Sequence, residues 1–571
     1  MGSTKIANSS QRALDGTGKN RWRVVDREVA WEDSAAGSVL LKAVSHWRQD
    51  SEAWFQGAYE RLPETVRVNP LRIDRGWVES WLSGVSAERI PWFSGPGSAW
   101  ELPFERGKAE GEVRVLLKAL HETGRLTRQE AASMLPVIAL DPKPEEVVLD
   151  MCASPGSKTT QICEHLGGGG AVVANEVMSG RVNILVSNIQ RHASRTAVVV
   201  QHDGRHIPMV PEGGFDRVLV DVPCTGSGTT RKNPDVWAKW LPSSGRSLHG
   251  LQSDLLSRAI RVTKRGGRIV YATCSLDPVE NEAVVARALE GGEVRIVPGH
   301  RLLGGVPSEP GLTEWPPLDD EGEPAEGLDV PESMMPPLDE VIRSKLSHCV
   351  RVWNDAIEGG GFFLAVLEKT GDGDQPAIQP TQVLSPDEVK PDPEAFPQPL
   401  DEEWERKLGT AWGAVPVSMW VRGKSLLWST DEVLGIWESE RGRRGGRTRV
   451  PGRRWRPLKV IHLGLVAARI RHGELERIVS RAATSLLPEI QRGFTEVGDE
   501  SINRILLGEE PRPGELDGSL DGVRGSHILV DEGGTCLAAW VGARVTPMVN
   551  EAERLVLRTM RGLPIVLVEE E

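Results

Sequence analysis

Five short apolar runs, separated by glycine-rich or helix-like segments, most constrain what this chain can fold into. They are VVLDM (147–151), AVVANE (171–176), TAVVVQHD (196–203), DRVLVDVP (216–223) and GRIVYATC (267–274). Runs of β-branched residues that alternate with helical segments are typical of a parallel sheet covered by helices on both faces. The sequence therefore predicts an α/β fold with a doubly wound sheet, to which GGFFLAVLEK (360–369) adds a further strand.

A second region, residues 26–140, precedes this alternation. It is predicted to be mostly helical, because apolar residues recur in it at about the helical period. The segments with this pattern are 39–62, 77–84 and 110–124. Residues 1–25 lack apolar periodicity and are predicted to be a disordered extension, and the sheet domain then covers 141–370.

Two proline-rich acidic segments interrupt the chain. Residues 304–340 hold eleven acidic residues and no Lys or Arg, and residues 371–403 hold nine acidic residues and seven prolines. Such compositions cannot bury enough apolar area to become ordered, so both are predicted to be solvated. The first precedes the last predicted strand and is an insertion within the sheet domain. The second is a linker to a smaller α+β domain at 404–571.

The distribution of charge matters more than the formal net charge of −13, which at first argues against a polyanionic partner. Without the two acidic segments, 67 basic and 61 acidic residues remain. The smaller domain contains RGRRGGRTRVPGRRWRPLK (441–459), with nine basic residues and no acidic one. Such a cluster is typical of a nucleic-acid-binding surface, of a solvated loop or of a nuclear localisation signal.

The strongest single motif is VVLDMCASPGSKTTQICEHL (147–166), in which a strand ends at Asp150 and a helix starts near Lys158. In doubly wound sheets a ligand binds beyond the carboxyl ends of the strands, at the first strand–helix turn. The spacing is neither GxGxxG nor GxxxxGK[ST], which disfavours dinucleotide and nucleoside triphosphate sites. The candidate cofactor-binding residues of this turn are Cys152, Ala153, Ser154, Pro155, Gly156, Ser157 and Lys158.

Carboxylates end the next two strands. Glu176 is placed to bind ribose hydroxyls, and Asp203 to accept from an adenine amine. Either carboxylate alone is as well explained as a helix cap. Together, at consecutive strand ends, they favour an adenosine ligand without a 2′-phosphate.

Three of the six cysteines are predicted at one edge of the sheet. Cys152, Cys224 and Cys274 each follow a strand, and Asp221 and Pro223 precede Cys224. A single buried cysteine is usually an inert small apolar residue, but three at one edge favour a thiol site. Core packing is the better interpretation of Cys163, Cys349 and Cys536. Neither a disulfide framework nor a zinc site is expected, because no CxxC pair or zinc-finger spacing occurs.

Three segments closely resemble the Sun (Fmu) family of RNA cytosine-5 methyltransferases. They are DMCASPGSKTTQ (150–161), DVPCTGSGTTRKN (221–233) and YATCSLDPVENEAV (271–284). LPETVRVNP (62–70) and VNEAERLVLRTMRGL (549–563) are similar to flanking regions of the eukaryotic branch that methylates tRNA at several sites. The departures are small, since Ser154 stands where Ala is usual and Glu176 where Asp is usual.

The resemblance implies a Rossmann-like sheet that binds S-adenosyl-L-methionine and a reaction through a covalent Cys–cytosine adduct. It assigns Cys274 as nucleophile, Cys224 to product release, Asp221 to the N3/N4 edge of the base, and Lys158 beside it. DNA cytosine-5 methyltransferases use the Pro-Cys position, here Cys224, and the sequence alone does not order the two thiols. Asp221 is also expected to contact the cofactor.

The resemblance also implies that tRNA is the substrate. Residues 26–140 would then bind RNA, 404–571 would form a PUA-like RNA-binding domain, and Arg231, Lys232 and Asn233 would hold RNA phosphates or form a solvated basic turn. Alternatives are a ribosomal RNA methyltransferase or assembly factor of the same family, or a non-catalytic RNA-binding protein.

No membrane partner is expected, since no apolar run approaches the roughly 18 residues that span a bilayer. No metal partner is expected either. A monomer in the nucleus, nucleolus or cytoplasm is expected, with mitochondrial targeting as the alternative. The N-terminus lacks the apolar stretch of a secretion signal.

Overall fold

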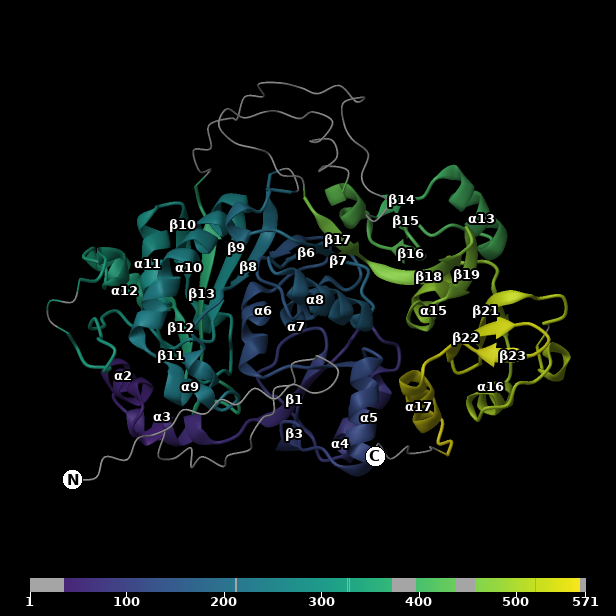
Figure 1. Ribbon diagram of the computed structural model, residues 1–571, viewed down its shortest axis with the longest axis horizontal. Helices are drawn as coiled ribbons and strands as arrows, with labels where there is room; N and C mark the ends of the chain where they lie inside the picture. Colours follow the sequence, from purple (N-terminus) through teal and green to yellow (C-terminus); the bar gives the residue numbers. More distant parts are fainter. Residues whose placement is uncertain are drawn as a thin grey trace, which may run out of the picture.

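The computed structural model describes residues 35–210, 213–325, 327, 329–371, 397–437, 458–518 and 520–564 (Figure 1). The predicted extension at 1–25, most of the linker 371–403 and all but the last two residues of the basic segment 441–459 lie outside the described residues.

A ten-stranded mixed sheet forms the centre of the molecule (Figure 1). Its path runs β11-β12-β13-β9-β8-β5-β6-β7-β17, with β10 paired to β13. Its strands are β5 (Val147–Asp150), β6 (Ala171–Asn175), β7 (Ala197–Val200), β8 (Phe215–Asp221), β9 (Thr263–Thr273), β10 (Val294–Val297), β11 (Glu309–Pro310), β12 (Val350–Val352), β13 (Phe362–Lys369) and β17 (Val460–Leu463). The five strands from β7 to β9 are parallel, as the sequence predicts. On either side of them, β13 pairs antiparallel with β9 and β17 pairs antiparallel with β7.

Helices cover both faces of this sheet, so the predicted doubly wound architecture is confirmed. One buried cluster joins the sheet to α10 and α11, and another joins its opposite face to α6, α7 and α8. These helices are α6 (Leu135–Leu140), α7 (Ser157–Leu166), α8 (Ser179–His192), α10 (Pro242–Val262) and α11 (Glu282–Glu290). Near-continuous apolar strands are required here, because a parallel sheet is buried on both sides.

The N-terminal region contains the predicted helices and, in addition, a four-stranded antiparallel sheet that the sequence analysis did not predict. The helices are α2 (Val39–Trp47), α3 (Ser51–Tyr59), α4 (Arg75–Gly84) and α5 (Gly111–Glu122). The strands, in the order β2-β3-β1-β4, are β1 (Pro63–Val68), β2 (Glu88–Arg89), β3 (Ser98–Glu105) and β4 (Leu126–Arg128). Charged residues inside β1, such as Glu64 and Arg67, hide its strand pattern, although both are buried.

A buried ion pair joins this N-terminal sheet to the central domain. Arg67 of β1 donates through Nε to Glu164 of α7 at 2.5 Å, and both side chains are almost fully buried. Thr160 Oγ1 accepts a further hydrogen bond from Arg67 at 3.1 Å, and His192 contacts Glu164 at 3.0 Å. The guanidinium lowers the pKa of Glu164 against the opposing effect of burial, which is the larger single influence. The carboxylate is therefore charged and depends on Arg67.

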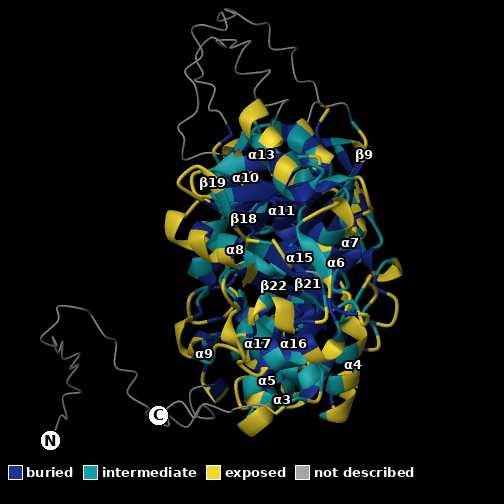
Figure 2. Cartoon of the chain, turned by 90° about the vertical axis from the view of Figure 1, so that its right-hand side faces the viewer, coloured by how far each residue is buried: buried dark blue, intermediate teal, exposed yellow. Residues whose placement is uncertain are grey.

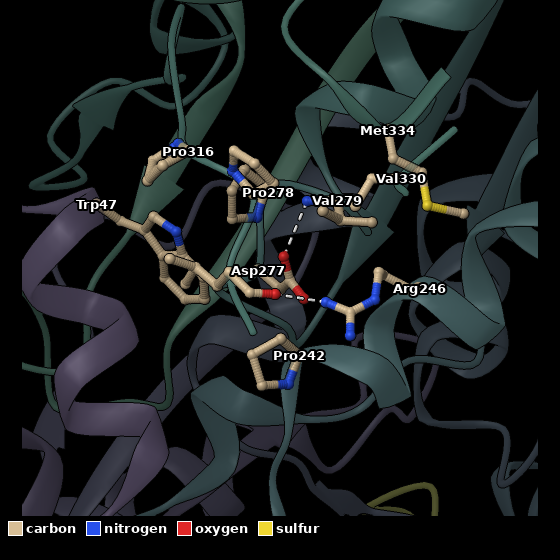
Figure 3. A pocket seen from close by; sticks show the side chains of 11 residues that line it. Trp47, Pro242, Arg246, Asp277, Pro278, Val279, Pro316, Val330 and Met334 are labelled. Atoms are coloured by element: carbon tan, nitrogen blue, oxygen red, sulfur yellow. Dashed lines mark hydrogen bonds between the residues drawn. The ribbon is translucent and has the colours of Figure 1, made fainter. Parts of the chain in front are cut away.

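The acidic insertion 304–340 is ordered over most of its length, so the prediction of a solvated segment is wrong. Trp315 and Leu318 are buried in the central core, and Trp315 Nε1 donates to the carbonyl of Met334 at 3.0 Å. Figure 3 shows residues of the insertion around Trp47 and Arg246, and Arg246 donates to the Leu318 carbonyl at 2.6 Å. Composition averages over such a segment and misses the two apolar side chains that anchor it.

Among the described residues, the C-terminal part contains two further sheets and several helices. The first sheet has β14 (Gln398–Pro399), β15 (Met419–Arg422), β16 (Ser425–Trp428), β18 (Leu465–Arg471) and β19 (Glu474–Ile478). The second has β20 (Phe494–Glu496), β21 (Gly525–Val530), β22 (Cys536–Val541) and β23 (Val545–Pro547). The helices are α13 (Glu402–Trp412), α15 (Ser480–Leu486), α16 (Asp499–Leu506) and α17 (Glu551–Met560).

Two contacts fix the C-terminal part against the rest of the chain. Strand β17, predicted as part of the smaller domain, pairs with β7 and extends the central sheet, so it crosses the predicted division at 404. Helix α17 packs against α5, where Glu553 accepts two hydrogen bonds from Arg125 at 2.7 and 2.9 Å (Figure 2). The predicted α+β character is confirmed.

The Arg67–Glu164 pair gives a test of this organisation. Arg67→Met leaves the Glu164 carboxylate buried without its cation, and such a loss costs about 3–5 kcal/mol of folding free energy. Native-state hydrogen exchange of the α7 amides measures this loss. As a matched control, Arg287→Met removes an exposed pair with Glu290 and should change stability by at most about 1 kcal/mol. Equal losses in the two variants would contradict a structural role for the buried pair.

Candidate active site

A cleft of about 820 Å³ lies at the carboxyl edge of the parallel strands, a volume within the range of small-ligand sites. Its wall includes all the candidate residues of the first strand–helix turn, from Cys152 to Lys158, together with Asp150, Asp221 and Cys274. The in-register pairing of β5 with β8 and of β8 with β9 brings these strand ends to one place. The N-terminal region contributes Arg106, Glu130 and Ser133 to the lining of the same cleft.

The turn between β5 and α7 is held from α8. Arg181 donates to the Ser154 carbonyl at 2.7 Å, and Asn188 donates to the Pro155 carbonyl at 2.7 Å. Gly156 has a φ of 113°, which favours glycine, and a Cβ there would come within 3.0 Å of Leu185. The backbone of this turn therefore stays open toward the cleft, next to the N-terminus of α7.

Asp150 is a site residue that the sequence analysis used only to mark the end of a strand. Thr159 donates to its Oδ2 at 2.6 Å, while Oδ1 is buried and has no hydrogen-bond partner within the described part of the chain. Burial, and secondarily the Asp221 carboxylate, raises the pKa of Asp150 to about 7. An acceptor without a partner beside the cleft fits a ligand that carries N–H or O–H donors.

Lys158 and Asp221 form an ion pair of 2.8 Å between Nζ and Oδ2. Lys158 also donates to Ser133 Oγ at 2.8 Å and lies 5.4 Å from the centroid of the Phe362 ring. Burial by itself lowers the pKa of Lys158, but Asp221 raises it above its ordinary value, so the ammonium is charged. Ser133 and Phe362 lie outside the three motifs, so their place at this site was not predicted from the sequence.

The two predicted thiols meet at this point. The Sγ atoms of Cys224 and Cys274 are 3.2 Å apart, within hydrogen-bond distance for sulfur. Cys274 lines the cleft and is close enough to Lys158 to raise the pKa of the lysine, whereas Cys224 does not line the cleft. The hydrogen bond with Cys274, and then desolvation, raise the pKa of the Cys224 thiol. The two cysteines thus differ in access to a ligand.

The third thiol of the predicted group, Cys152, lines the cleft in the first turn. Desolvation and the carboxylates of Asp150, Asp221 and Glu176 raise its pKa, so this thiol stays protonated. Its environment is that of a neutral wall residue. Cys163 and Cys349 are buried in the cores, as expected, whereas Cys536 is only partly buried.

Glu176 and Asp203 lie at their predicted strand ends but do not line the 820 Å³ cleft. Glu176 accepts from the Met178 amide at 2.9 Å and lies 3.5 Å from Arg181. Asp203 accepts from the Arg205 amide at 3.0 Å and forms an ion pair with its side chain at 2.7 Å. Their contact with a nucleoside stays a prediction, and the capping alternative is realised at Asp203.

Arg231 does not form part of an exposed basic turn. It is buried and donates to the carbonyls of Glu60 and Arg61, while its guanidinium pairs with Glu358 at 2.8 Å. These contacts join the glycine-rich loop after β8 to two other segments. Gly228 lies in the same loop, where a Cβ would clash with the carbonyl of Gly361 at 2.2 Å. Lys232 and Asn233, in contrast, are exposed.

Two further observations concern metal ions and membranes. Within the residues that the structure describes, no group of three His, Cys, Asp or Glu side chains is placed to hold a metal ion. None of the described helices has both the length and the apolar character needed to cross a bilayer.

Comparisons with known proteins agree with this site. Residues 137–316 match the family model described as 16S rRNA methyltransferase RsmB/F. The chain is 36% identical over 248 residues to the tRNA (cytosine(49)-C(5))-methyltransferase of Pyrococcus abyssi, a match that covers 43% of this chain and 77% of that protein. The chain belongs to this family of RNA cytosine-5 methyltransferases. S-adenosyl-L-methionine is the cofactor of the family, and the open turn and the unpartnered Asp150 oxygen fit such a ligand.

Other relatives of this chain are longer than the matched region. It is 37% identical over 316 residues to the multisite-specific tRNA:(cytosine-C(5))-methyltransferase of Saccharomyces cerevisiae, which covers 51% of this chain and 46% of that protein. The chain spans less than half the length of the first curated relatives it matches. A solved methyltransferase homologue from Pyrococcus horikoshii has 28% identity and a TM-score of 0.44, over 60% of this chain and all of that one.

The raised pKa of Asp150 predicts a pH dependence of the stability of this protein. An aspartate in an unfolded chain ionises near pH 4, whereas Asp150 in the fold ionises near pH 7. Unfolding releases a proton between these values, so the contribution of Asp150 to stability falls as the pH rises from 4 to 7. The neutral variant Asp150→Asn lacks this contribution.

The measurement compares urea unfolding of the two proteins at several pH values. The stability of the wild type minus that of Asp150→Asn should fall by about a few kcal/mol over this window. Effects of other groups, such as the raised pKa of Asp277, cancel in the difference. Parallel curves would contradict the assignment.

Proposed function

We propose that this protein methylates C5 of cytosine in tRNA, through a covalent bond between Cys274 Sγ and C6 of the base. The observation that carries the proposal is the pair of thiols 3.2 Å apart, of which only Cys274 lines the cleft that contains the Lys158–Asp221 ion pair. The cofactor S-adenosyl-L-methionine supplies the methyl group when bound.

The chemistry of cytosine explains why this set of side chains is needed. C5 is a weak nucleophile, and addition of a thiolate to C6 converts the C5–C6 double bond into an enamine that reacts at C5. The Cys274 Sγ–C6 bond then breaks as the C5 proton leaves and the double bond returns. Lys158 is a cation that lies close to Cys274.

Asp221 and Cys224 serve the two remaining steps in this proposal. The Asp221 carboxylate, held by Lys158, would bind the N3/N4 edge of the cytosine and stabilise its protonated form during attack. Cys224, adjacent to the nucleophile but outside the cleft wall, would assist removal of the C5 proton and release of Cys274. In the cofactor site, Asp150 and the turn Cys152–Ser157 would hold the amino-acid end, and Glu176 and Asp203 the nucleoside.

The substrate class is supported by the functions for which the relatives are named. The S. cerevisiae, Drosophila melanogaster and P. abyssi proteins are named as tRNA cytosine-C5 methyltransferases. A ribosomal RNA substrate is the second candidate, because a Salmonella small-subunit methyltransferase is 38% identical over 39% of this chain. A PUA-like role for 404–571, an RNA-binding role for 26–140, and a nuclear or cytoplasmic monomer complete the proposal.

Labelled S-adenosyl-L-methionine distinguishes the substrates directly. We expect methyl transfer to bulk tRNA and none to small-subunit ribosomal RNA, with bisulfite sequencing identifying the cytosine. Transfer to ribosomal RNA alone would replace the tRNA assignment, and no transfer to either would favour a non-catalytic RNA-binding role.

The two cysteines give opposite predictions. Cys274→Ala should abolish methyl transfer and adduct formation, whereas Cys224→Ala should accumulate a covalent protein–RNA adduct on denaturing gels, because release is blocked. Cys536→Ala, at a partly buried thiol of β22 outside the cleft, serves as the matched control and should retain wild-type turnover. An active Cys274→Ala together with an inactive Cys224→Ala without adduct would reverse the two roles.

A further inference from the structure

The cations of the cleft wall fall into two groups. Three of them have a partner: Lys158 pairs with Asp221, Arg128 pairs with Glu64, and Arg191 contacts the His121 ring. Arg106 and Lys232 also line the cleft, but no hydrogen bond or ion pair of either side chain occurs within the described residues. The site therefore holds two positive side chains that form no ion pair within the described residues.

Arg106 and Lys232 line the same cleft but come from different parts of the chain. Arg106 follows β3 of the N-terminal sheet, and Lys232 follows the glycine-rich loop after β8. Desolvation, and then the Arg106 guanidinium, lower the pKa of Lys232. The two cations are thus close enough to repel, and an anion between them would relieve both effects.

The neighbouring groups limit where this anion can lie. Lys232 is near enough to Cys274 and Lys158 for their charges to act on it. Glu130, the acid on the same wall, raises the pKa of Lys232, but its carboxylate accepts from the amides of Ala132, Ser133 and Gly360 and forms no ion pair with either cation within the described residues. An anion that contacts both cations therefore has to come from outside the protein, and it would lie near the nucleophile.

We infer that Arg106 and Lys232 form a phosphate subsite that holds one backbone phosphate of the RNA next to the target cytosine. This inference rests on the proposed function and extends it from the base to its backbone. A phosphodiester carries one negative charge and presents free oxygens to both cations. The buried Arg231 next to Lys232 fixes the loop and so holds the ammonium at the cleft.

Salt dependence of RNA binding tests the subsite. The probe is an unmodified tRNA transcript with the full-length protein, without cofactor, followed by fluorescence anisotropy between 50 and 200 mM KCl. Neutralising one single-stranded phosphate contributes about 0.7 to the salt slope. Lys232→Gln and Arg106→Gln should each lower the slope by part of this amount, because the other cation still contacts the phosphate, and Lys232→Arg should keep the wild-type slope.

Three controls make the result specific. Lys239→Gln carries the same charge change on α9 (Asp235–Lys239), where Lys239 is exposed and paired with Asp235, and it should keep the wild-type slope. The double variant should lower the salt slope by about 0.7 in total and no more, since both cations serve one phosphate. Affinity for S-adenosyl-L-methionine, measured by calorimetry, should stay unchanged, because a carboxylate of the cofactor is the other anion that two cations could hold.

The outcomes separate this inference from the proposed function. An unchanged salt slope in both single variants, or weaker cofactor binding with unchanged RNA binding, would overturn the phosphate subsite even if the wild type methylates tRNA. Loss of slope in a protein whose wild type methylates no tRNA would support the subsite and reject the proposed reaction.

Discussion

The parallel pairing of β5, β8 and β9 is the constraint on which the site depends. In such a sheet every parallel strand ends at the same edge, so three loops spread over more than a hundred residues of the sequence converge there. The Lys158–Asp221 ion pair joins the first of these loops to the second, and the contact between Cys224 and Cys274 joins the second to the third. Each reactive group is therefore held by a rigid strand end.

The N-terminal sheet completes the cleft. The buried Arg67–Glu164 pair fixes this sheet to α7, the helix that follows the cofactor turn. Two residues of the N-terminal region then contact the site. Ser133 accepts a hydrogen bond from Lys158, and Glu130 accepts one from the amide of Gly360. A charge buried in this way is favourable only with its partner present, which ties the second wall of the cleft to the first.

The charge pattern has a structural explanation. The insertion 304–340 carries acids that meet cations of the helical layer, as Glu323 does near Lys42 and Asp320 near Arg246. Some of its carboxylates thus form ion pairs with cations of α2 and α10. Arg106 and Lys232, in contrast, line the cleft without an ion pair among the described residues. A net negative chain consequently retains a positive site.

The sequence by itself determined the doubly wound sheet and its strand ends, because strand periodicity is a local property. Cys224, Cys274, Asp221 and Lys158 were singled out by the resemblance of three motifs to a known family, and their roles stay proposals. The insertion was mispredicted because Trp315 and Leu318 bury against residues far along the chain, and β1 was missed because its buried charges are satisfied only in the fold. Only the tertiary structure decided that Cys274 lines the cleft and that Arg231 is buried, and only it left Arg106 and Lys232 without partners. Access to a cleft depends on contacts between segments more than a hundred residues apart, which no local pattern records.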